Sequence, residues 1–304
     1  MPQYPIDMQS HSFFSDGDVS PTVLAQRAAA AGLRGIFLTD HATTAGWPEF
    51  SAACARLNLL TAPAVEITCR HGPLWFDTLA YGVDPSHADL HALVARNHQA
   101  FQLAVAHYFR WLDEGGRGPA IETICAHYRL PHRQPLGYWI NKYRSQVDGR
   151  SAEELTQDMQ AAGFSYEGRA DIYLAHLPPF SEVIRAVAAA GGLLALAHPG
   201  QTARRLYRAL PGADHLRQFL ALAEELCREG LEAIEMRHNS HTRELSAAVT
   251  AWAVGRAPPL LLTAGSDYHG DGVNEHKPHV HLGDHGLTIA EFAPLAVRLR
   301  LRLP

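Results

Sequence analysis

Short, uninterrupted apolar runs alternate along the chain with longer stretches in which apolar residues recur at helical spacing. The clearest short runs, typical of buried strands, cover residues 35–39, 193–197, 231–235 and 260–264. The first helical stretch opens with Ser20-Pro21, an N-cap followed by a proline in the first turn, and Gly32 marks its end. Because strands that alternate with helices form right-handed βαβ units, this pattern predicts a parallel sheet.

Three more apolar runs, Ile6–Met8, Ala64–Thr68 and Trp75–Tyr81, bring the expected number of strands to about seven. The length of 304 residues suits one α/β barrel, a fold that commonly takes about 250 residues, together with an insertion. The sequence therefore predicts an α/β fold in which the strand ends gather functional residues at one mouth.

The alternation of strands and helices breaks between residues 86 and 170. Residues 86–114 have the apolar spacing of one long helix, whereas residues 119–168 are richer in Pro, Gly, Arg and aromatic residues and contain no convincing strand. We interpret residues 1–85 and 171–304 as the barrel, and residues 86–170 as an inserted helical subdomain or lid.

Composition narrows the class of protein. Hydrophobic residues make up 47% of the chain and charged residues 19%, as expected of a soluble globular protein with a substantial core. The formal net charge of -5 argues against binding of a polyanion by bulk attraction. It leaves room for an anionic substrate, because bound metal ions would reverse the field inside a pocket. Histidine stands out, with 19 residues against 26 lysines and arginines.

Signals for targeting and thiol chemistry are absent from the sequence. No signal peptide is visible at the N-terminus, and the longest apolar run, residues 186–197, is too short to span a bilayer. None of the four cysteines stands in a CxxC pair, so neither a thiolate zinc site nor a redox dithiol is supported. We expect a cytoplasmic enzyme without membrane association.

Five stretches place side chains that bind metals directly after a buried apolar segment. They are Asp7-Met8-Gln9-Ser10-His11 with Ser15-Asp16-Gly17, Thr39-Asp40-His41, Val65-Glu66, Ala197-His198-Pro199 and Gly265-Ser266-Asp267-Tyr268-His269. Imidazole and carboxylate groups bind Zn, Mn or Fe, and a carboxylate can bridge two ions. Because barrel strands end at one mouth, these stretches predict a single multinuclear metal site.

The order and approximate spacing of these stretches resemble the motifs of the polymerase and histidinol phosphatase (PHP) family. The resemblance runs from about Asp7 to Gly46 and resumes at Val-Glu, Ala-His-Pro-Gly and Gly-Ser-Asp-x-His, so it frames nearly the whole chain outside the insertion. It implies a distorted (β/α)7 barrel with a helical insertion. It also implies two to three divalent ions, drawn from Mn, Zn, Fe and Mg, and hydrolysis of phosphate esters.

Carried over motif by motif, the resemblance implies three adjoining metal positions. His11, Glu66 and Asp267 would belong to one ion, and Glu66 would bridge to a second ion bound by His198.

The third ion would be held by Asp16, His41 and His269. Asp40 would orient His41 or the attacking water and not bind metal directly. Asp40 and His41 are therefore the two residues assigned to catalysis.

Two positions depart from the family pattern. Gln9 stands where the family has its first histidine, and it is either a weak amide ligand or an ordinary polar residue. Asp77, in the strand-like segment 75–82, stands where the family often has another metal histidine. An aspartate can replace a histidine as a ligand and favours harder ions, so we interpret Asp77 as a ligand.

Candidates for substrate binding are less well defined. In the insertion, His132 and Arg133 resemble a phosphate-contacting element of relatives that act on nucleotides, with an exposed basic loop as the alternative. Trp139 could offer an aromatic face to a base. After the strand that ends at residue 235, Arg237, His238 and His241 are placed at the mouth or just outside it, and Arg237 and His241 are taken as the candidates for substrate binding.

Arg204 and Arg205, just past His198, could reach an anionic substrate but are interpreted as solvated helix charges. The sequence thus predicts a metal-dependent phosphoric ester hydrolase that uses a metal-activated water. The expected substrate is a small phosphate ester: a nucleotide, a nucleoside bisphosphate or a short oligonucleotide. Two alternatives stay open, namely a PHP-like binding or structural protein with reduced catalysis and a metal-dependent amide hydrolase.

Overall fold

The computed structural model describes residues 3–116, 118–131, 137–163, 175–209, 214–270 and 280–303. Within these residues, each of the seven apolar runs of the sequence forms or overlaps a strand. The strands are β1 (Ile6–Ser10), β2 (Gly35–Leu38), β3 (Ala64–His71), β4 (Leu74–Tyr81), β5 (Leu193–Leu196), β6 (Ala233–Arg237) and β7 (Leu261–Ala264). Strands β1 and β2 pair in parallel, and the other five form a sheet in the order β3-β4-β5-β6-β7.

The expectation of an entirely parallel sheet is wrong at β4. This strand is antiparallel to both β3 and β5, whereas β5, β6 and β7 are parallel to one another. Only Gly72 and Pro73 separate β3 from β4, and parallel neighbours need a crossover of a dozen or more residues. The short connection therefore forces a hairpin, with Gly72 at a φ of +59° in its turn.

The two sheets enclose one interior, but the described residues do not form a single closed sheet. One core cluster takes side chains from both sheets, among them Ile6, Phe37, Leu79 and Ala195. Isolated bridges also join Ser10 to Tyr268 and His41 to Glu66. The fold is therefore a mixed α/β fold in which the polar strand ends converge, and closure of a (β/α)7 barrel is not confirmed.

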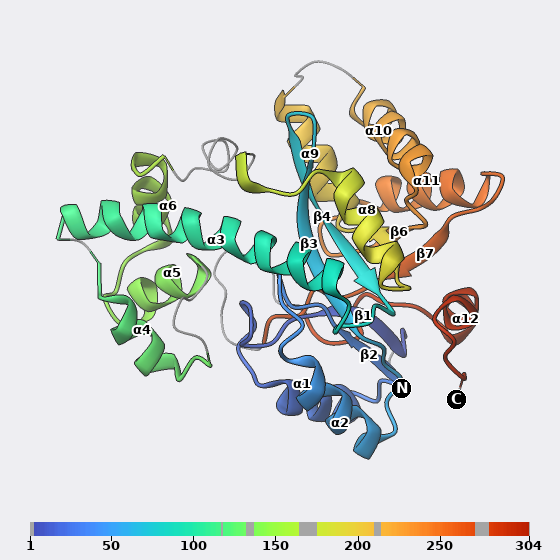
Figure 1. Cartoon of the computed structure of the whole chain (residues 1–304), viewed down its shortest axis with the longest axis horizontal. Coiled ribbons are helices and arrows are strands. Elements are labelled where there is room, and N and C mark those ends of the chain that lie inside the picture. The colour runs from blue at the N-terminus through green and yellow to red at the C-terminus, as the bar shows by residue number, and fades with distance from the viewer. Residues whose placement is uncertain are drawn as a thin grey trace.

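Helices pack on the outside of the strands, with α1 and α2 on one side and α8 to α11 on another (Figure 1). Their bounds are α1 (Pro21–Ala30), α2 (Trp47–Leu57), α8 (Phe180–Ala189), α9 (Pro199–Ala209), α10 (His215–Glu229), α11 (Arg243–Val254) and α12 (Ile289–Arg298). The predicted start of α1 is confirmed: the Ser20 side chain accepts a hydrogen bond from Val23 N, and Pro21 occupies the first turn. Gly32, at a φ of +78°, follows its end.

Between β4 and α8 the chain forms a separate group of helices, which Figure 1 shows extending away from the sheets. It comprises α3 (Ala88–Glu114), α4 (Ile121–Tyr128), α5 (Gly137–Gln146) and α6 (Ala152–Ala161). The group has its own core around Tyr108, Ile124 and Ile140, against which Phe13 and Trp75 from the strand region also pack. Assignment of residues 86–170 as an inserted subdomain or lid stays a proposal.

Candidate metal centre

The loop that follows β1 is held in shape by the carboxylate of Asp40. Asp40 Oδ1 accepts hydrogen bonds from Ser12 N and the Ser15 hydroxyl, both at 2.7 Å, and Oδ2 accepts the Ser12 hydroxyl at 2.6 Å. Both carboxylate oxygens are thus engaged by residues 11–16, the segment that carries the first candidate ligands. Asp40 is placed to shape this loop, and these hydrogen bonds do not involve His41.

Four expected ligands meet at this loop: His11, Asp16, His41 and His269. One ligand atom of each lies within 4.8 Å of the others. Asp16 Oδ2 is 3.2 Å from His269 Nε2 and 3.8 Å from His41 Nε2. The rings of His41 and His269 both stack on His11, at centroid distances of 4.7 and 4.2 Å. Three imidazoles and one carboxylate form a donor set suited to zinc or manganese.

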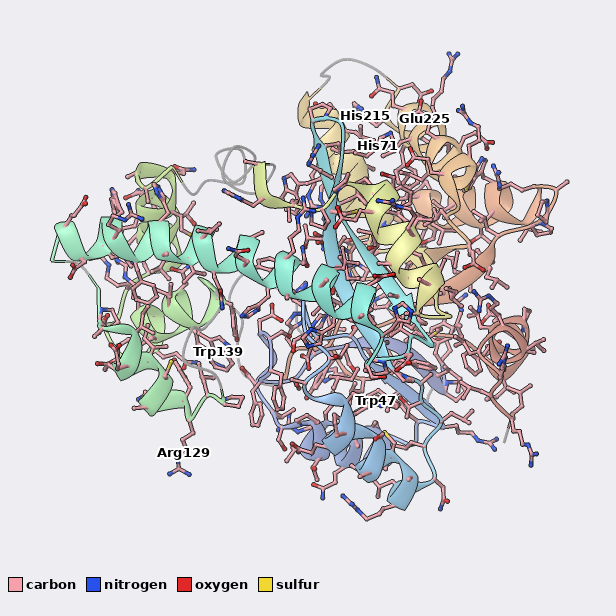
Figure 2. The ribbon with its side chains drawn as sticks, in the orientation of Figure 1. Trp47, His71, Arg129, Trp139, His215 and Glu225 are labelled. Atoms are coloured by element: carbon pink, nitrogen blue, oxygen red, sulfur yellow. The ribbon has the colours of Figure 1, made fainter. Side chains whose placement is uncertain are left out.

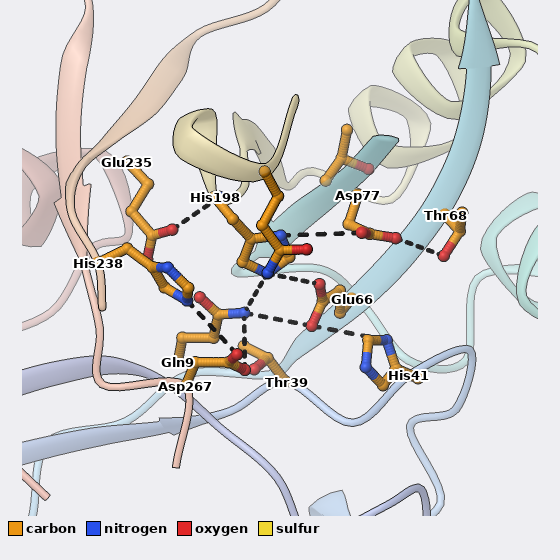
Figure 3. Close-up of polar contacts among 12 residues, drawn as sticks. Gln9, Thr39, His41, Glu66, Thr68, Asp77, His198, Glu235, His238 and Asp267 are labelled. Carbon is orange, nitrogen blue, oxygen red and sulfur yellow. Dashed lines mark hydrogen bonds and ion pairs between the residues drawn. The ribbon is translucent and has the colours of Figure 1, made fainter. Parts of the chain in front are cut away.

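Glu66, fully buried near the start of β3, stands between this group and a second one (Figure 3). Its Oε2 is 3.3 Å from His11 Nε2 and 3.6 Å from His41 Nδ1, while Oε1 is 3.0 Å from His198 Nε2. Asp267 Oδ1 lies 3.1 Å from His11 Nε2. Glu66 therefore presents one oxygen to each side, which is the arrangement that a bridging carboxylate requires.

Gln9 lies within this second group. Its side-chain nitrogen is 2.8 Å from His198 Nε2 and 3.3 Å from both Glu66 Oε2 and Asp267 Oδ1, as Figure 3 shows. The backbone at Gly265 packs directly against Gln9. Any side chain at position 265 would collide with Gln9, because a Cβ there would lie 2.5 Å from Gln9 Cβ. Rotation of the amide would turn its oxygen, a neutral metal ligand, toward the same groups.

Asp77, on β4, flanks the other side of His198. Its Oδ2 is 3.8 Å from His198 Nδ1 and 3.6 Å from Arg205 Nη1, and its Oδ1 accepts a hydrogen bond from the Thr68 hydroxyl at 2.6 Å. Asp77, Glu66 and His198 offer ligand atoms within 4.8 Å of one another. Asp77 is thus brought to the centre, at the edge that adjoins α9.

His238 lies in the centre as well, although the sequence placed it only at the possible mouth and not among the ligands. It is buried, and its Nε2 lies 3.4 Å from Asp267 Oδ2 in a group that includes His198. Its position directly after β6 satisfies the same strand-end rule that identified the other ligands. His241, the residue preferred from the sequence, lies behind it, with ring centroids 5.8 Å apart.

The remaining candidates lie elsewhere. Arg237 forms a bidentate pair with Glu291 and also donates to the Gly286 carbonyl, so its guanidinium is engaged away from the ligand groups. Trp139 is buried and donates its indole N–H to the Ser15 carbonyl at 2.8 Å, which leaves its ring unavailable to a base. His132 and Arg133 fall outside the described residues.

The electrostatics of the centre fit a cation. Burial acts to lower the pKa of His11, but Asp267, Glu66 and Asp16 outweigh it and raise this pKa well above its usual value. Burial also acts to lower the pKa of His198, but Glu66, Asp267 and Asp77 outweigh it and raise this pKa to about 9. The carboxylates thus attract protons onto imidazoles, and divalent ions would replace those protons.

Two further observations favour occupancy by metal. His11 Nε2 and Glu66 Oε1 are buried and make no well-formed hydrogen bond among the described residues, as expected of atoms that are directed at an ion. His198 and Asp267 also adopt left-handed backbone conformations, with φ of +37° and +56°. Such strain in residues other than glycine concentrates at functional sites, where it fixes the aim of a side chain.

Comparisons with known proteins show the family to which the chain belongs. Residues 7–174, more than half of the chain, match the model of the PHP domain. The chain belongs to the PHP domain family. It is 24% identical over 270 residues to a 5'-3' exoribonuclease of Haemophilus influenzae, a match that covers 86% of this chain and 89% of the relative.

Two other similarities extend this comparison. The chain is 37% identical to a 3',5'-nucleoside bisphosphate phosphatase of Chromobacterium violaceum over 87 residues. This match covers 29% of this chain and 30% of the relative. The crystal structure of an inferred metal-dependent phosphoesterase from Bifidobacterium adolescentis superposes with a TM-score of 0.68 at 25% identity, covering 98% of this chain and 97% of that one. The chain is accordingly a hydrolase of the metal-dependent phosphoesterase class.

No described helix combines the length and apolar character needed to cross a membrane.

Proposed function

We propose that this chain hydrolyses small phosphate esters of the nucleotide type, among them nucleotides, nucleoside bisphosphates and short oligonucleotides. The observation that carries the proposal is the set of four overlapping groups of His, Asp and Glu ligand atoms, each group within 4.8 Å, at converging strand ends. Phosphate ester hydrolysis needs such concentrated positive charge, because both attacking and leaving oxygens must be stabilised.

Two to three divalent ions are proposed at this centre, with manganese, zinc, iron or magnesium as candidates. Asp16, His41 and His269 would hold one ion with His11. Glu66 would link it to the region of Gln9, His198 and Asp267, where His238 would be an additional ligand. Divalent ions bound there would lower the pKa of water toward 7 and polarise phosphoryl oxygens.

The protein side chains have distinct parts in this proposal. His41 and Asp16 are the more exposed members of their group, with 19% and 13% of their side chains accessible, so they mark the side from which substrate arrives. Asp40 keeps the loop of residues 11–16 in place through Ser12 and Ser15. Positioning of this kind lets the reaction proceed without rearrangement of the site.

The substrate class is supported by the relatives. Their names describe an exoribonuclease, a nucleoside bisphosphate phosphatase and, for an Eggerthella lenta protein with 24% identity over 292 residues, a phosphoribosyl cyclic phosphate diphosphodiesterase. All three names refer to phosphate esters of ribose or of nucleosides. Nucleotide-like esters are therefore the first substrates to test.

A second candidate is a PHP-like protein with reduced catalysis that binds its ligand without cleaving it. The observation in its favour is Gln9, whose amide joins Glu66, His198 and Asp267 through short contacts. An internal network of this type can stabilise an acidic pocket without an ion.

One experiment separates the two. Protein purified without chelator is analysed for bound metals and assayed against AMP, a nucleoside 3',5'-bisphosphate, a dinucleotide and p-nitrophenyl phosphate, with and without added Mn²⁺. We expect more than one metal ion per chain and cleavage of at least one nucleotide ester. No metal uptake and no cleavage would reject the proposed function and favour the binding protein.

A further inference from the structure

A buried arginine adjoins the metal centre beside Asp77. Arg205 lies on α9, which begins directly after His198, and it is 9% exposed. Its Nη1 is 3.6 Å from Asp77 Oδ2, and its guanidinium carbon lies 3.6 Å above the ring of Trp75. The sequence suggested a solvated helix charge, and the structure shows instead a guanidinium held between a carboxylate and an aromatic face.

The neighbouring Arg204, on the same helix, is a solvent-exposed arginine with which Arg205 can be compared. Arg204 is exposed and donates to the Ser240 carbonyl at 3.1 Å. Arg205 instead shares a neighbour with His198, because Asp77 Oδ2 lies 3.6 Å from Arg205 Nη1 and 3.8 Å from His198 Nδ1. The direction of α9 therefore brings Arg205, and not Arg204, to the metal centre.

The contacts of Asp77 are those of an anchor for this cation. One of its oxygens accepts the Thr68 hydroxyl at 2.6 Å, and the other faces Arg205 Nη1 and His198 Nδ1 at 3.6 and 3.8 Å. An ion bound to Asp77 would stand close to the guanidinium and be repelled by it. The Nε2 of His198 faces Glu66 Oε1 at 3.0 Å, so this nitrogen would be the ligand atom of His198.

We propose that Arg205 is a substrate-binding residue that holds a phosphate group at the edge of the centre, with Asp77 as its anchor and not as a metal ligand. The inference rests on the proposed function. The planar guanidinium presents paired N–H donors, which match the oxygens of a phosphate group. Asp77 and Trp75 fix its orientation before substrate arrives, so little conformational entropy is lost on binding.

Four variants test the assignment: Arg205→Met, Arg205→Lys, Asp77→Asn and, as the matched control on the same helix, Arg204→Met. Each is loaded with Mn²⁺, and its metal content is measured by elemental analysis. Binding of inorganic phosphate is then measured by calorimetry, and circular dichroism checks that each variant is folded.

We expect Arg205→Met to keep its full metal content and to bind inorganic phosphate about tenfold more weakly or worse. Arg205→Lys keeps the charge but not the paired donors, so it should lie between Arg205→Met and the unsubstituted protein. Asp77→Asn should also keep its metal and weaken phosphate binding severalfold, because the anchor is lost. Arg204→Met should match the unsubstituted protein.

Loss of an ion in Asp77→Asn would show that Asp77 is a ligand and would overturn the assignment. Phosphate binding that is undetectable in the unsubstituted protein, or unchanged in both Arg205 variants, would overturn it as well. The outcome is distinguishable from failure of the proposed function: Arg205-dependent phosphate binding without cleavage of any ester would support the binding site and reject the hydrolase.

Discussion

The strand ends and helices α3 to α6 differ in the partners that surround their buried polar side chains. At the strand ends, Glu66 and His11 are completely buried beside other ionisable side chains, an arrangement that is costly unless a cation compensates it. Among helices α3 to α6, two buried polar side chains find partners in neighbouring helices: the Tyr108 hydroxyl donates to Asn141, and Arg144 pairs with Asp158. The strand ends therefore gather ionisable side chains that a cation would compensate, whereas Arg144 and Asp158 compensate each other.

The two regions meet at the loop that follows β1. Trp139 of α5 donates to the Ser15 carbonyl, and Lys142 and Tyr138 of the same helix donate to Asp18. The Asp18 backbone N–H in turn donates to the His269 carbonyl at 2.6 Å. Helix α5 thus contacts, from outside, the segment that carries Asp16.

The largest effect is expected from Glu66, because it faces both ligand groups. Glu66→Gln keeps the size of the side chain but removes the charge that would bridge two ions. We expect loss of at least one ion per chain and a fall in turnover of about 10²–10³-fold on every ester. Elemental analysis and steady-state assays measure both, and full metal content with normal turnover would contradict the bridging role.

His41→Ala should come next, since His41 lies at the more open side of the same centre. Turnover of nucleotide esters and of p-nitrophenyl phosphate should fall by a similar factor, because the residue serves the metal chemistry common to both substrates. A variant that stays fully active on every ester would show that the ligand set taken from the PHP resemblance is wrong at this position.

Much of the centre could be predicted from sequence because the ligands stand directly after apolar runs. The buried strands β1, β3, β5 and β7 are visible as such runs, and chain geometry then places the polar residues that follow them. His238 obeys the same rule, since it follows β6 directly, but the sequence did not distinguish it as a ligand from the neighbouring Arg237 and His241.

Other features depend on contacts that no local pattern encodes. Burial of Arg205 requires Trp75 and Asp77 from β4 to face α9, and the engagement of Asp40 requires the fold of residues 11–16. The antiparallel β3–β4 pair was missed although its short connection was visible. Here strand direction follows from connection length, and the apolar pattern does not report it.

A smaller effect is expected where the insertion holds the loop. Lys142→Met removes the partner of Asp18 in a contact where only 10% and 12% of the two side chains are exposed. We expect metal affinity to fall by up to about tenfold, with turnover nearly normal once metal is saturating. Metal titration followed by activity separates the two quantities.

Arg150→Met is the matched control for this variant. Arg150 pairs with Glu154 and Asp158, so its loss removes ion pairs of the same group of helices away from the loop. Equal changes in metal affinity in both variants would mean that Lys142 acts through the general stability of the helices and not through Asp18.

The smallest effect is expected from Arg129, at the end of α4, which tests whether the basic stretch of the insertion reaches substrate. Figure 2 shows its side chain pointing away from the rest of the molecule, and the residue is exposed. Arg129→Ala removes a charge that is screened by solvent, so kcat/KM for AMP and for p-nitrophenyl phosphate should both change by less than about twofold. A selective loss with AMP would show that this arginine contacts the nucleotide, and the insertion would then act as a lid that contributes to recognition in addition to supporting the loop of residues 11–16.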